Sequence, residues 1–394
     1  MSIHHCTRSA REVLRSAELS LLLLFACEGF LFAADATGSH RPNVPPGVEY
    51  LHHRIGEGPW SIHVVKVARS AKRFQFVSTL AQDQVYGLAT VSQQAATLQD
   101  ARAVAAVNGD FFVIRRGPYQ GDPLGLHVAQ GELISSPRGP SFWIDREGQP
   151  HIGQVTAQFR AVGPTGPSIP FNLNEERGDD EAVLYTPAVG PSTRTNVGLE
   201  WILEKAGEGA RLPLRPGASF GARVAAITEG GDAELTPTTM VLSVGPMLAE
   251  RLQAKAPGSV LTLHLETVPD LTGIVTAIGG GPILLDEGRS PEWPPPQPRH
   301  PRTALGWNDE QFVLVVVDGR QEGLSVGMTY PELALLMKRL GCRYAVNLDG
   351  GGSSTLWLDG HVMNSPSDGR ERPVANSLVV IATEPNAVAE GLQN

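Results

Sequence analysis

The chain has 394 residues, of which 41% are hydrophobic and 19% are charged, so it is long enough to bury a large globular core. A net charge of −9 without a basic stripe argues against nucleic acid as the main partner. Its 43 glycines, 31 prolines and low aromatic share of 6% favour short strands and turns over long helices.

The first 36 residues have the pattern of an export signal peptide. Three arginines precede a mainly apolar stretch, residues 19–34, and small residues surround a candidate cleavage point at 33–36. The apolar stretch is short for a membrane-spanning helix, and Glu28 is costly in lipid. A retained anchor and a lipoprotein at Cys27 are the alternatives. We therefore expect an exported protein, periplasmic or extracellular, that meets a membrane only through an uncleaved leader.

The cysteine content agrees with export without disulfides. Cys6 and Cys27 lie in the leader, so a mature chain keeps only Cys342. One cysteine can form neither an intrachain disulfide nor a multi-cysteine metal site. Because Cys342 lies between a predicted helix end and an apolar strand, we expect it to be buried as a small hydrophobe.

Behind the leader we expect an N-terminal segment, residues 37–84, whose strands lead into the main region, residues 85–385, with a short tail at 386–394. The middle, about 155–273, consists of strand-like pieces that form either a separate β-rich domain or part of the same sheet. The first half contains short predicted elements, namely strands at 62–67, 74–79 and 103–107, a helix at 88–98, and hairpin strands at 125–128, 133–136 and 141–145.

The last third predicts a strand–helix–strand unit. Residues 312–317 are six consecutive apolar residues, mostly β-branched, which is typical of a buried strand. Thr329 and Glu332 have capping-box spacing, and apolar residues then follow at helical spacing until Gly341, which is placed to end the helix. Residues 344–348 form the next strand.

This unit sets the predicted fold class. If its strands are parallel, Asp318 and Asp349 lie at neighbouring carboxyl ends, where open α/β sheets bind ligands. We therefore predict an α+β or mixed α/β fold, a single domain with a mixed β-sheet core, flanking helices and additional β-hairpins.

Acidic residues end three of the predicted strands: Asp110, Asp318 and Asp349. A lone Asp-Gly pair is normally only a turn, but three such ends favour a shared site. Arginines occur near the same motifs, at positions 302, 320 and 372. The turn at residues 350–352, with the serines that follow it, could cradle an anion through backbone N–H groups.

Carboxylates that converge at a sheet edge could also hold Ca²⁺ or Mg²⁺. The sequence contains no His-x-x-x-His or comparable pair of ligands. We therefore predict no required cofactor or metal, with Ca²⁺ or Mg²⁺ as the alternative.

Several short motifs occur in a fixed order along the chain. In that order they resemble the phosphodiester glycosidase domain family over roughly residues 85–383. The motifs are Asn108-Gly109-Asp110-Phe111-Phe112, Gly279-Gly280-Gly281-Pro282, Pro301-Arg302-Thr303-Ala304-Leu305-Gly306, Val317-Asp318-Gly319-Arg320, Gly327-Met328-Thr329, Asn347-Leu348-Asp349-Gly350-Gly351-Gly352-Ser353-Ser354 and Arg372-Pro373-Val374-Ala375-Asn376.

The resemblance implies hydrolysis of a carbohydrate substrate, a sugar-1-phosphodiester, to a sugar and a phosphomonoester. Arginines recognise such an anion well, and a carboxylate must stabilise the oxocarbenium-like centre or activate water. We expect Asp349 to be that carboxylate and Asp318 to be the second acid or base, with Asn347 and Arg320 beside them. The other residues expected to bind substrate are Arg302, Asn108, Asp110, Gly350, Gly351, Gly352, Ser353, Ser354, Glu322, Arg372 and Asn376.

Two other functions fit the same residues. One is a non-catalytic glycan-binding protein of the cell envelope, and the other is a metal-dependent phosphodiesterase that cleaves the P–O bond. Teichoic-acid-like polymers, capsular polysaccharides and nucleotide sugars all fit as substrates. The sequence leaves the oligomeric state open.

Overall fold

The computed structural model describes most of the chain between residues 42 and 383. The predicted leader and the predicted tail lie outside the described residues. Within the described part, none of the helices has the length and apolar character needed to cross a membrane. The described ranges are 42–56, 58–71, 73–98, 102–164, 166–206, 212–252 and 256–383.

The fold is mostly β, with 45% strand and 10% helix, and it includes a nearly closed, strongly curved sheet. The predicted α+β fold with flanking helices is therefore wrong. The strong helix signal after Thr329 is confirmed. Most of the rest of the chain consists of strands that are separated by glycine- and proline-containing turns and pair in antiparallel fashion. The α-helices of the described residues are α2 (Val91–Ala96), α3 (Pro246–Arg251) and α4 (Tyr330–Arg339).

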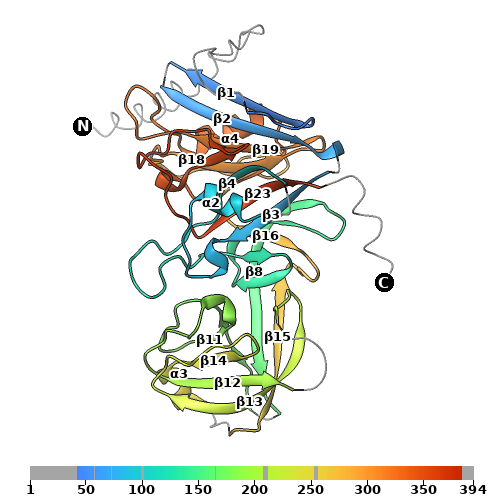
Figure 1. Cartoon of the computed structure of the whole chain (residues 1–394), viewed down its shortest axis with the longest axis vertical. Coiled ribbons are helices and arrows are strands. Elements are labelled where there is room, and N and C mark those ends of the chain that lie inside the picture. Colours follow the sequence, from blue (N-terminus) through green and yellow to red (C-terminus); the bar gives the residue numbers. More distant parts are fainter. Residues whose placement is uncertain are drawn as a thin grey trace, which may run out of the picture. The chain divides into compact units, whose positions relative to one another are not determined.

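A six-stranded antiparallel sheet holds the two strands that lead into Asp318 and Asp349 (Figure 1). Strands β19 and β20 each pair antiparallel with β18, so they run in the same direction. Their carboxyl ends therefore reach the same edge, although β18 lies between them. In order, the strands are β1 (Val48–Ile55), β2 (Trp60–Ala68), β19 (Gln311–Val317), β18 (Arg302–Trp307), β20 (Tyr344–Asn347) and β17 (Ile283–Leu285).

A five-stranded antiparallel sheet packs against the first. Apolar side chains of both sheets, such as Val65 and Leu314 from the first and Val107 and Leu378 from the second, share one buried cluster. This shared core fixes the end of β4 close to the ends of β19 and β20. In order, the strands are β22 (His361–Val362), β21 (Leu356–Leu358), β4 (Arg102–Asn108), β23 (Asn376–Ala382) and β3 (Phe74–Leu80).

Helix α4 covers the outer face of the first sheet. It begins with the predicted capping box of Thr329 and Glu332. Its Met337 packs against Gly306 of β18, where a Cβ would lie only 2.7 Å from the Met337 Cε, so glycine makes this close packing possible. Cys342, after the helix, is buried as predicted.

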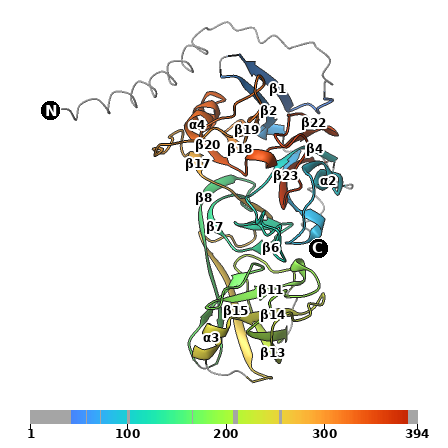
Figure 2. The same ribbon diagram turned by 90° about the vertical axis from the view of Figure 1, so that its left-hand side faces the viewer.

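Helix α2 covers the outer face of the second sheet. Its Val91 and Ala95 share a buried cluster with Ala106 of β4. The helix is shorter than predicted because a capping box at Thr90 begins it. Figure 2 shows α4 and α2 on opposite sides of the two sheets.

The middle of the chain forms a twelve-stranded sheet that is continuous with the predicted hairpins. It has its own core, which includes Trp201, Leu242 and Leu263, whereas Phe142 and Ile278 pack into the core that the other two sheets share. In order, the strands are β10 (Asn172–Leu173), β11 (Ala182–Tyr185), β14 (Met240–Val244), β12 (Leu199–Lys205), β13 (Ser219–Glu229), β15 (Val260–Val268), β8 (Pro150–Val162), β7 (Arg138–Ile144), β16 (Thr276–Gly279), β5 (His127–Ala129) and β6 (Glu132–Ser135), with β9 (Ile169–Pro170) beside β8.

Candidate functional site

Asn108 ties the ends of β4 and β20 together. Its Nδ2 donates to the Asp349 carbonyl at 2.7 Å, and its Oδ1 accepts from the Thr303 hydroxyl at 2.7 Å and the Thr355 N–H at 3.1 Å. The Asp349 N–H in turn donates to the Gly109 carbonyl at 2.9 Å. Asn108 is fully buried, so its amide positions the strand ends from inside the protein.

Asp318 is the centre of a buried hydrogen-bonded network. Its Oδ2 accepts from the Ser61 hydroxyl at 2.8 Å and lies 3.2 Å from His63 Nε2. Its Oδ1 accepts from Asn364 Nδ2 at 3.2 Å and from the Ser365 N–H at 2.9 Å. The side chain is 1% exposed. These four partners engage both oxygens, so Asp318 joins β19 to β2 and to the segment after β22.

Hydrogen bonds decide the charge state of Asp318. Burial acts to raise the pKa of this carboxyl, but the hydrogen bond and charge of His63 and the hydrogen bonds of Ser61 and Asn364 together hold the pKa below its usual value. Behind His63, the Tyr50 hydroxyl lies 2.8 Å from His63 Nδ1. Burial, with the charge of Asp318, raises the pKa of Tyr50 to about 12.

Asp349 lies in a different environment. It is half-buried and begins a short turn, residues 349–354, which we call the Asp349 turn; the turn contains the 3-10 helix η4 (Gly351–Ser353). One oxygen, Oδ1, accepts from the Gly350 N–H at 2.7 Å. Burial raises the pKa of Asp349, and the neighbouring Ser353 and Gly350 and the charges of Arg372 and Arg320 oppose that rise.

Two guanidinium groups pack onto the glycines of the Asp349 turn. A Cβ on Gly351 would lie 3.1 Å from both Nη atoms of Arg320, and a Cβ on Gly352 would lie 2.0 Å from Nη2 of Arg372. Glycine therefore lets each guanidinium lie flat against the backbone beside Asp349. Arg320 is exposed, takes a left-handed conformation with φ 59°, and donates to Nδ1 of His300 at 3.1 Å.

The backbone of the turn is largely engaged within the protein. The N–H groups of Gly350, Gly351, Ser353 and Ser354 donate to Asp349 Oδ1 and to the carbonyls of Pro301, Gly350 and Gly351, respectively. These four N–H groups are therefore not available to an incoming anion. The positively charged groups beside the turn are the side chains of Arg320 and Arg372.

Asp110 lies behind the turn and is enclosed. Its backbone N–H donates to Oδ1 of Asn376, whose Nδ2 lies 2.9 Å from Nδ1 of His127. A Cβ on Gly279 would lie 2.2 Å from Asp110 Oδ2, which has no hydrogen-bond partner among the described residues. Burial raises the pKa of Asp110 to about 7, with a smaller contribution from the charge of Asp349. The hydrogen bond between Asp110 and Asn376 thus connects the end of β4 to the start of β23.

The remaining predicted residues surround the turn in different ways. Arg302 is buried, donates to the carbonyls of Met328 and Pro298 at 2.8 and 3.0 Å, and lies 4.0 Å from the centre of the Tyr330 ring. Asn347 donates to the Gly281 carbonyl at 2.8 Å. Glu322 is exposed on the turn after β19, away from the hydrogen bonds described above.

Some buried polar atoms near the Asp349 turn have no hydrogen-bond partner in the described part of the chain. They are Asn347 Oδ1, Ser354 Oγ and Thr355 Oγ1. Buried polar groups in folded proteins nearly always bond to protein, water or ligand. Their concentration next to Asp349 is therefore a feature of a binding site.

The sequence interpretation missed the partners that control these groups. Ser61 and His63 lie two residues apart on β2, so both side chains point to the same face, and polar residues at such buried positions are a usable signal. Asp368, four residues before Arg372, contacts it at 2.7 Å. His300 and Asn364 have no comparable signal, because they reach the site from loops.

No metal-binding group of three or more His, Cys, Asp or Glu side chains occurs among the residues that the structure describes. The carboxyls of Asp110, Asp318 and Asp349 reach one edge, but the first two point into separate hydrogen-bonded surroundings. That no metal is required, with Ca²⁺ or Mg²⁺ as the alternative, stays a prediction.

Comparisons with known proteins agree with the motifs. Residues 221–381 match the model of the phosphodiester glycosidase family. A segment covering 33% of the chain is 30% identical to the N-acetylglucosamine-1-phosphodiester alpha-N-acetylglucosaminidase of Mus musculus, over 29% of that protein. A segment covering 21% is 41% identical to the SPbeta prophage-derived uncharacterized protein YomE of Bacillus subtilis, over 13% of it. The matches thus span less than a third of these relatives.

A solved structure shares the fold. The crystal structure of a hypothetical protein from Synechocystis superposes with a TM-score of 0.69 at 21% identity, over 86% of this chain and 64% of that one. Fold, site and motifs define a mostly β protein with a carboxylate flanked by arginines. The match of residues 221–381 to the family model confirms the resemblance to the phosphodiester glycosidase domain family that was drawn from the motifs.

Proposed function

We propose that this protein is an exported hydrolase that cleaves a sugar-1-phosphodiester to a sugar and a phosphomonoester. The observation that carries the proposal is the half-buried carboxylate of Asp349 between Arg320 and Arg372 on a glycine turn. The description of the family and the name of the mouse relative refer to the same linkage.

The arginines suit a phosphodiester, which carries one negative charge. Arg372 already has a carboxylate partner, because its Nε and Nη2 lie 2.9 and 2.7 Å from Oδ2 of Asp368. Arg320 is exposed and hydrogen-bonds to the neutral ring of His300 rather than to a carboxylate of the described residues, so it is the principal phosphate ligand. Its left-handed backbone costs about 1–3 kcal/mol, a strain that is concentrated at functional sites.

Asp349 supplies the carboxylate chemistry. Gly350 engages one oxygen and orients the group, and in the proposed mechanism the carboxylate acts on the substrate through its other oxygen. Water adds to the anomeric carbon, the bond from that carbon to the phosphate oxygen breaks, and its electron pair leaves with the phosphate. Asp349 stabilises the positive charge that develops on the sugar ring and accepts the proton that water loses.

A phosphate is a good leaving group, so the reaction needs little assistance from an acid. This agrees with the state of the other two carboxyls, since Asp318 has four hydrogen-bond partners and Asp110 is enclosed. In the proposed mechanism both are positioning residues. Asn108 and Arg302 act in the same way, because they fix the strand ends and the loop that leads into β18.

Hydrolysis of UDP-N-acetylglucosamine in ¹⁸O-labelled water tests the proposal. We expect ¹⁸O in the released sugar, and we expect Asp349→Asn to lower kcat/KM by about 10²–10⁴-fold. Asp83→Asn, an exposed aspartate away from the site, is the matched control. Label in the phosphate, with loss of activity in a chelator, would establish a metal-dependent phosphodiesterase instead. Absence of turnover on a panel of sugar phosphodiesters would favour a glycan-binding protein.

A further inference from the structure

A pocket of about 270 Å³ lies at the other end of the strands that carry the Asp349 site. It is lined by the 3-10 helix η1 (Arg69–Ala71), the β7–β8 hairpin, the β18–β19 hairpin and the start of β20. Trp307, in its wall, lies five residues along β18 from Arg302, which is roughly 17 Å in a strand. The pocket therefore shares no residue with the proposed catalytic site.

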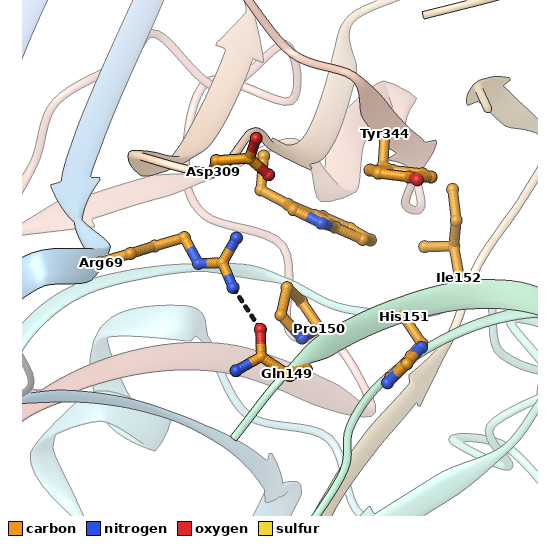
Figure 3. Close-up of a pocket in the computed structure, with 8 residues that line it drawn as sticks. Arg69, Gln149, Pro150, His151, Ile152, Asp309 and Tyr344 are labelled. Carbon is orange, nitrogen blue, oxygen red and sulfur yellow. Dashed lines mark hydrogen bonds between the residues drawn. The ribbon is translucent and has the colours of Figure 1, made fainter. Parts of the chain in front are cut away.

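Two stacked aromatic rings form part of the pocket wall, and Tyr344, the more exposed of the two, lies at its surface. The rings of Trp307 and Tyr344 lie 5.3 Å apart with an interplanar angle of 20°. Phe142 and Phe312 pack around Trp307, with ring centres 5.6 and 6.4 Å away. Figure 3 shows Tyr344 and Ile152 on one side of the pocket. Because the aromatic cluster is packed on several sides, the wall is formed before any ligand binds.

Planar polar groups complete the lining. Arg69 donates to the Asn308 carbonyl at 2.7 Å and to Gln149 Oε1 at 2.8 Å (Figure 3). His151 stacks on Trp143, with ring centres 5.4 Å apart, and its Nε2 lies 2.7 Å from Oδ2 of Asp145. Arg69 and His151 are therefore held in fixed orientations. With Gln149, they place donors and acceptors of hydrogen bonds next to one another in the pocket.

The charges in the pocket balance one another. Asp309, which is mostly exposed, opposes the charge of Arg69 and lies 3.6 Å from Nη1 of Arg343. A strongly anionic or cationic ligand therefore gains little here, in contrast to the Asp349 site with its two arginines. The volume is just below the range of about 300–1,000 Å³ typical of pockets for drug-sized ligands, which suits a smaller ring.

We propose that this pocket is a second, non-catalytic binding site for one neutral sugar residue of a glycan. The apolar face of the sugar ring packs against Tyr344 and Ile152, which line the pocket, and its hydroxyls bond to Arg69, Gln149 and His151. The choice of a sugar rests on the proposed function, whereas the pocket and its neutral character rest on its own residues.

Binding of neutral methyl glycosides tests the inference. A panel of methyl glucoside, galactoside and N-acetylglucosaminide is titrated against the full chain and followed by saturation-transfer NMR and tryptophan fluorescence. We expect saturable binding of at least one glycoside, weakened about tenfold or more by Gln149→Ala and by Tyr344→Ala. Glu147→Ala, on the same hairpin but outside the pocket, is the matched control and binds like the wild type.

The variants separate this inference from the proposed function. Asp349→Asn is expected to bind the glycoside as the wild type does. Saturable binding that Asp349→Asn abolishes and Gln149→Ala leaves intact would overturn the inference, as would no binding by the wild type. Thermal unfolding shows whether the Tyr344→Ala protein is folded. If it is not, the result for Gln149→Ala decides, because Gln149 is exposed and its substitution does not disturb the core. Turnover without glycoside binding refutes only the second site, and binding without turnover refutes only the hydrolase.

Discussion

Asp318 and Asp349 follow buried strands in the same way, yet the structure treats them differently. Each comes after an apolar run, precedes a glycine and lies at the same edge of the six-stranded sheet. Asp318 is 1% exposed and bonds to four partners. Asp349 is half-buried, with one oxygen bonded to the next residue and two guanidinium groups nearby.

The difference comes from residues that are distant in sequence. Ser61 and His63, more than 250 residues before Asp318, hold the pKa of that carboxyl below its usual value through hydrogen bonds. Around Asp349 burial prevails, so its pKa is raised. The same local motif thus gives a fully hydrogen-bonded carboxylate in one place and, in the proposed mechanism, a reactive one in the other.

The same substitution at both positions should have the largest and most contrasting effects. We expect Asp349→Asn to lower kcat/KM by about 10²–10⁴-fold while unfolding is nearly unchanged. We expect Asp318→Asn to lower the free energy of unfolding by about 2–4 kcal/mol, because its new amide N–H₂ faces groups that are themselves donors. Steady-state kinetics and denaturant unfolding of both variants measure the two effects.

This contrast has a clear contrary outcome. If Asp318→Asn unfolds like the wild type but loses activity as fully as Asp349→Asn, then Asp318 exchanges a proton with the substrate. The original prediction of a second acid or base would then replace the positioning role proposed here.

Asp110, at the end of β4, gives a third carboxyl for the comparison. Its pKa is raised from 3.8 to about 7, so between these values the folded protein holds a proton that the unfolded chain releases. Its stabilisation is complete below pH 3.8 and is lost as the pH rises through about 7. We expect the unfolding free energy of the wild type minus that of Asp110→Asn to fall by up to a few kcal/mol over this interval.

Urea unfolding at several pH values measures this difference. The buried His127 has the opposite effect, since its pKa is lowered to about 3 and its contribution to stability is lost as the pH falls below 6.5. That effect is present in both proteins and cancels in the difference. A difference that does not change with pH would mean that Asp110 ionises as freely as an exposed aspartate.

Local signals predicted local structure well. The capping box at Thr329, the strand predicted at 312–317 and the burial of Cys342 depend on neighbouring residues and are confirmed. The predicted fold class was wrong because flanking helices were inferred from one clear helix, α4. Elsewhere in the chain, the choice between helix and sheet depends on long-range pairing. The insertion of β18 between β19 and β20 depends on such pairing and leaves no local signal.

The site shows the same division. The ordered motifs brought Asp349, Arg320 and Arg372 together and indicated the family. They did not show that Asn108 and Arg302 bond to protein carbonyls, because a hydrogen-bond partner is a property of the folded chain. The glycines of the Asp349 turn were expected to offer free backbone N–H groups to an anion. In the structure, the side chains of Arg320 and Arg372 pack against them instead.

The glycines therefore offer the most delicate test of how Asp349 differs from Asp318. Gly352→Ala places a Cβ 2.0 Å from Nη2 of Arg372 and 2.4 Å from Oδ2 of Asp368, and these side-chain ends can move away together without unfolding the protein. We expect KM for a sugar phosphodiester to rise about tenfold, with kcat and the thermal midpoint little changed. Gly56→Ala, where a Cβ meets nothing within 4 Å, is the matched control. An unchanged KM would show that Arg372 serves only its ion pair with Asp368, leaving Arg320 as the ligand that distinguishes the reactive strand end.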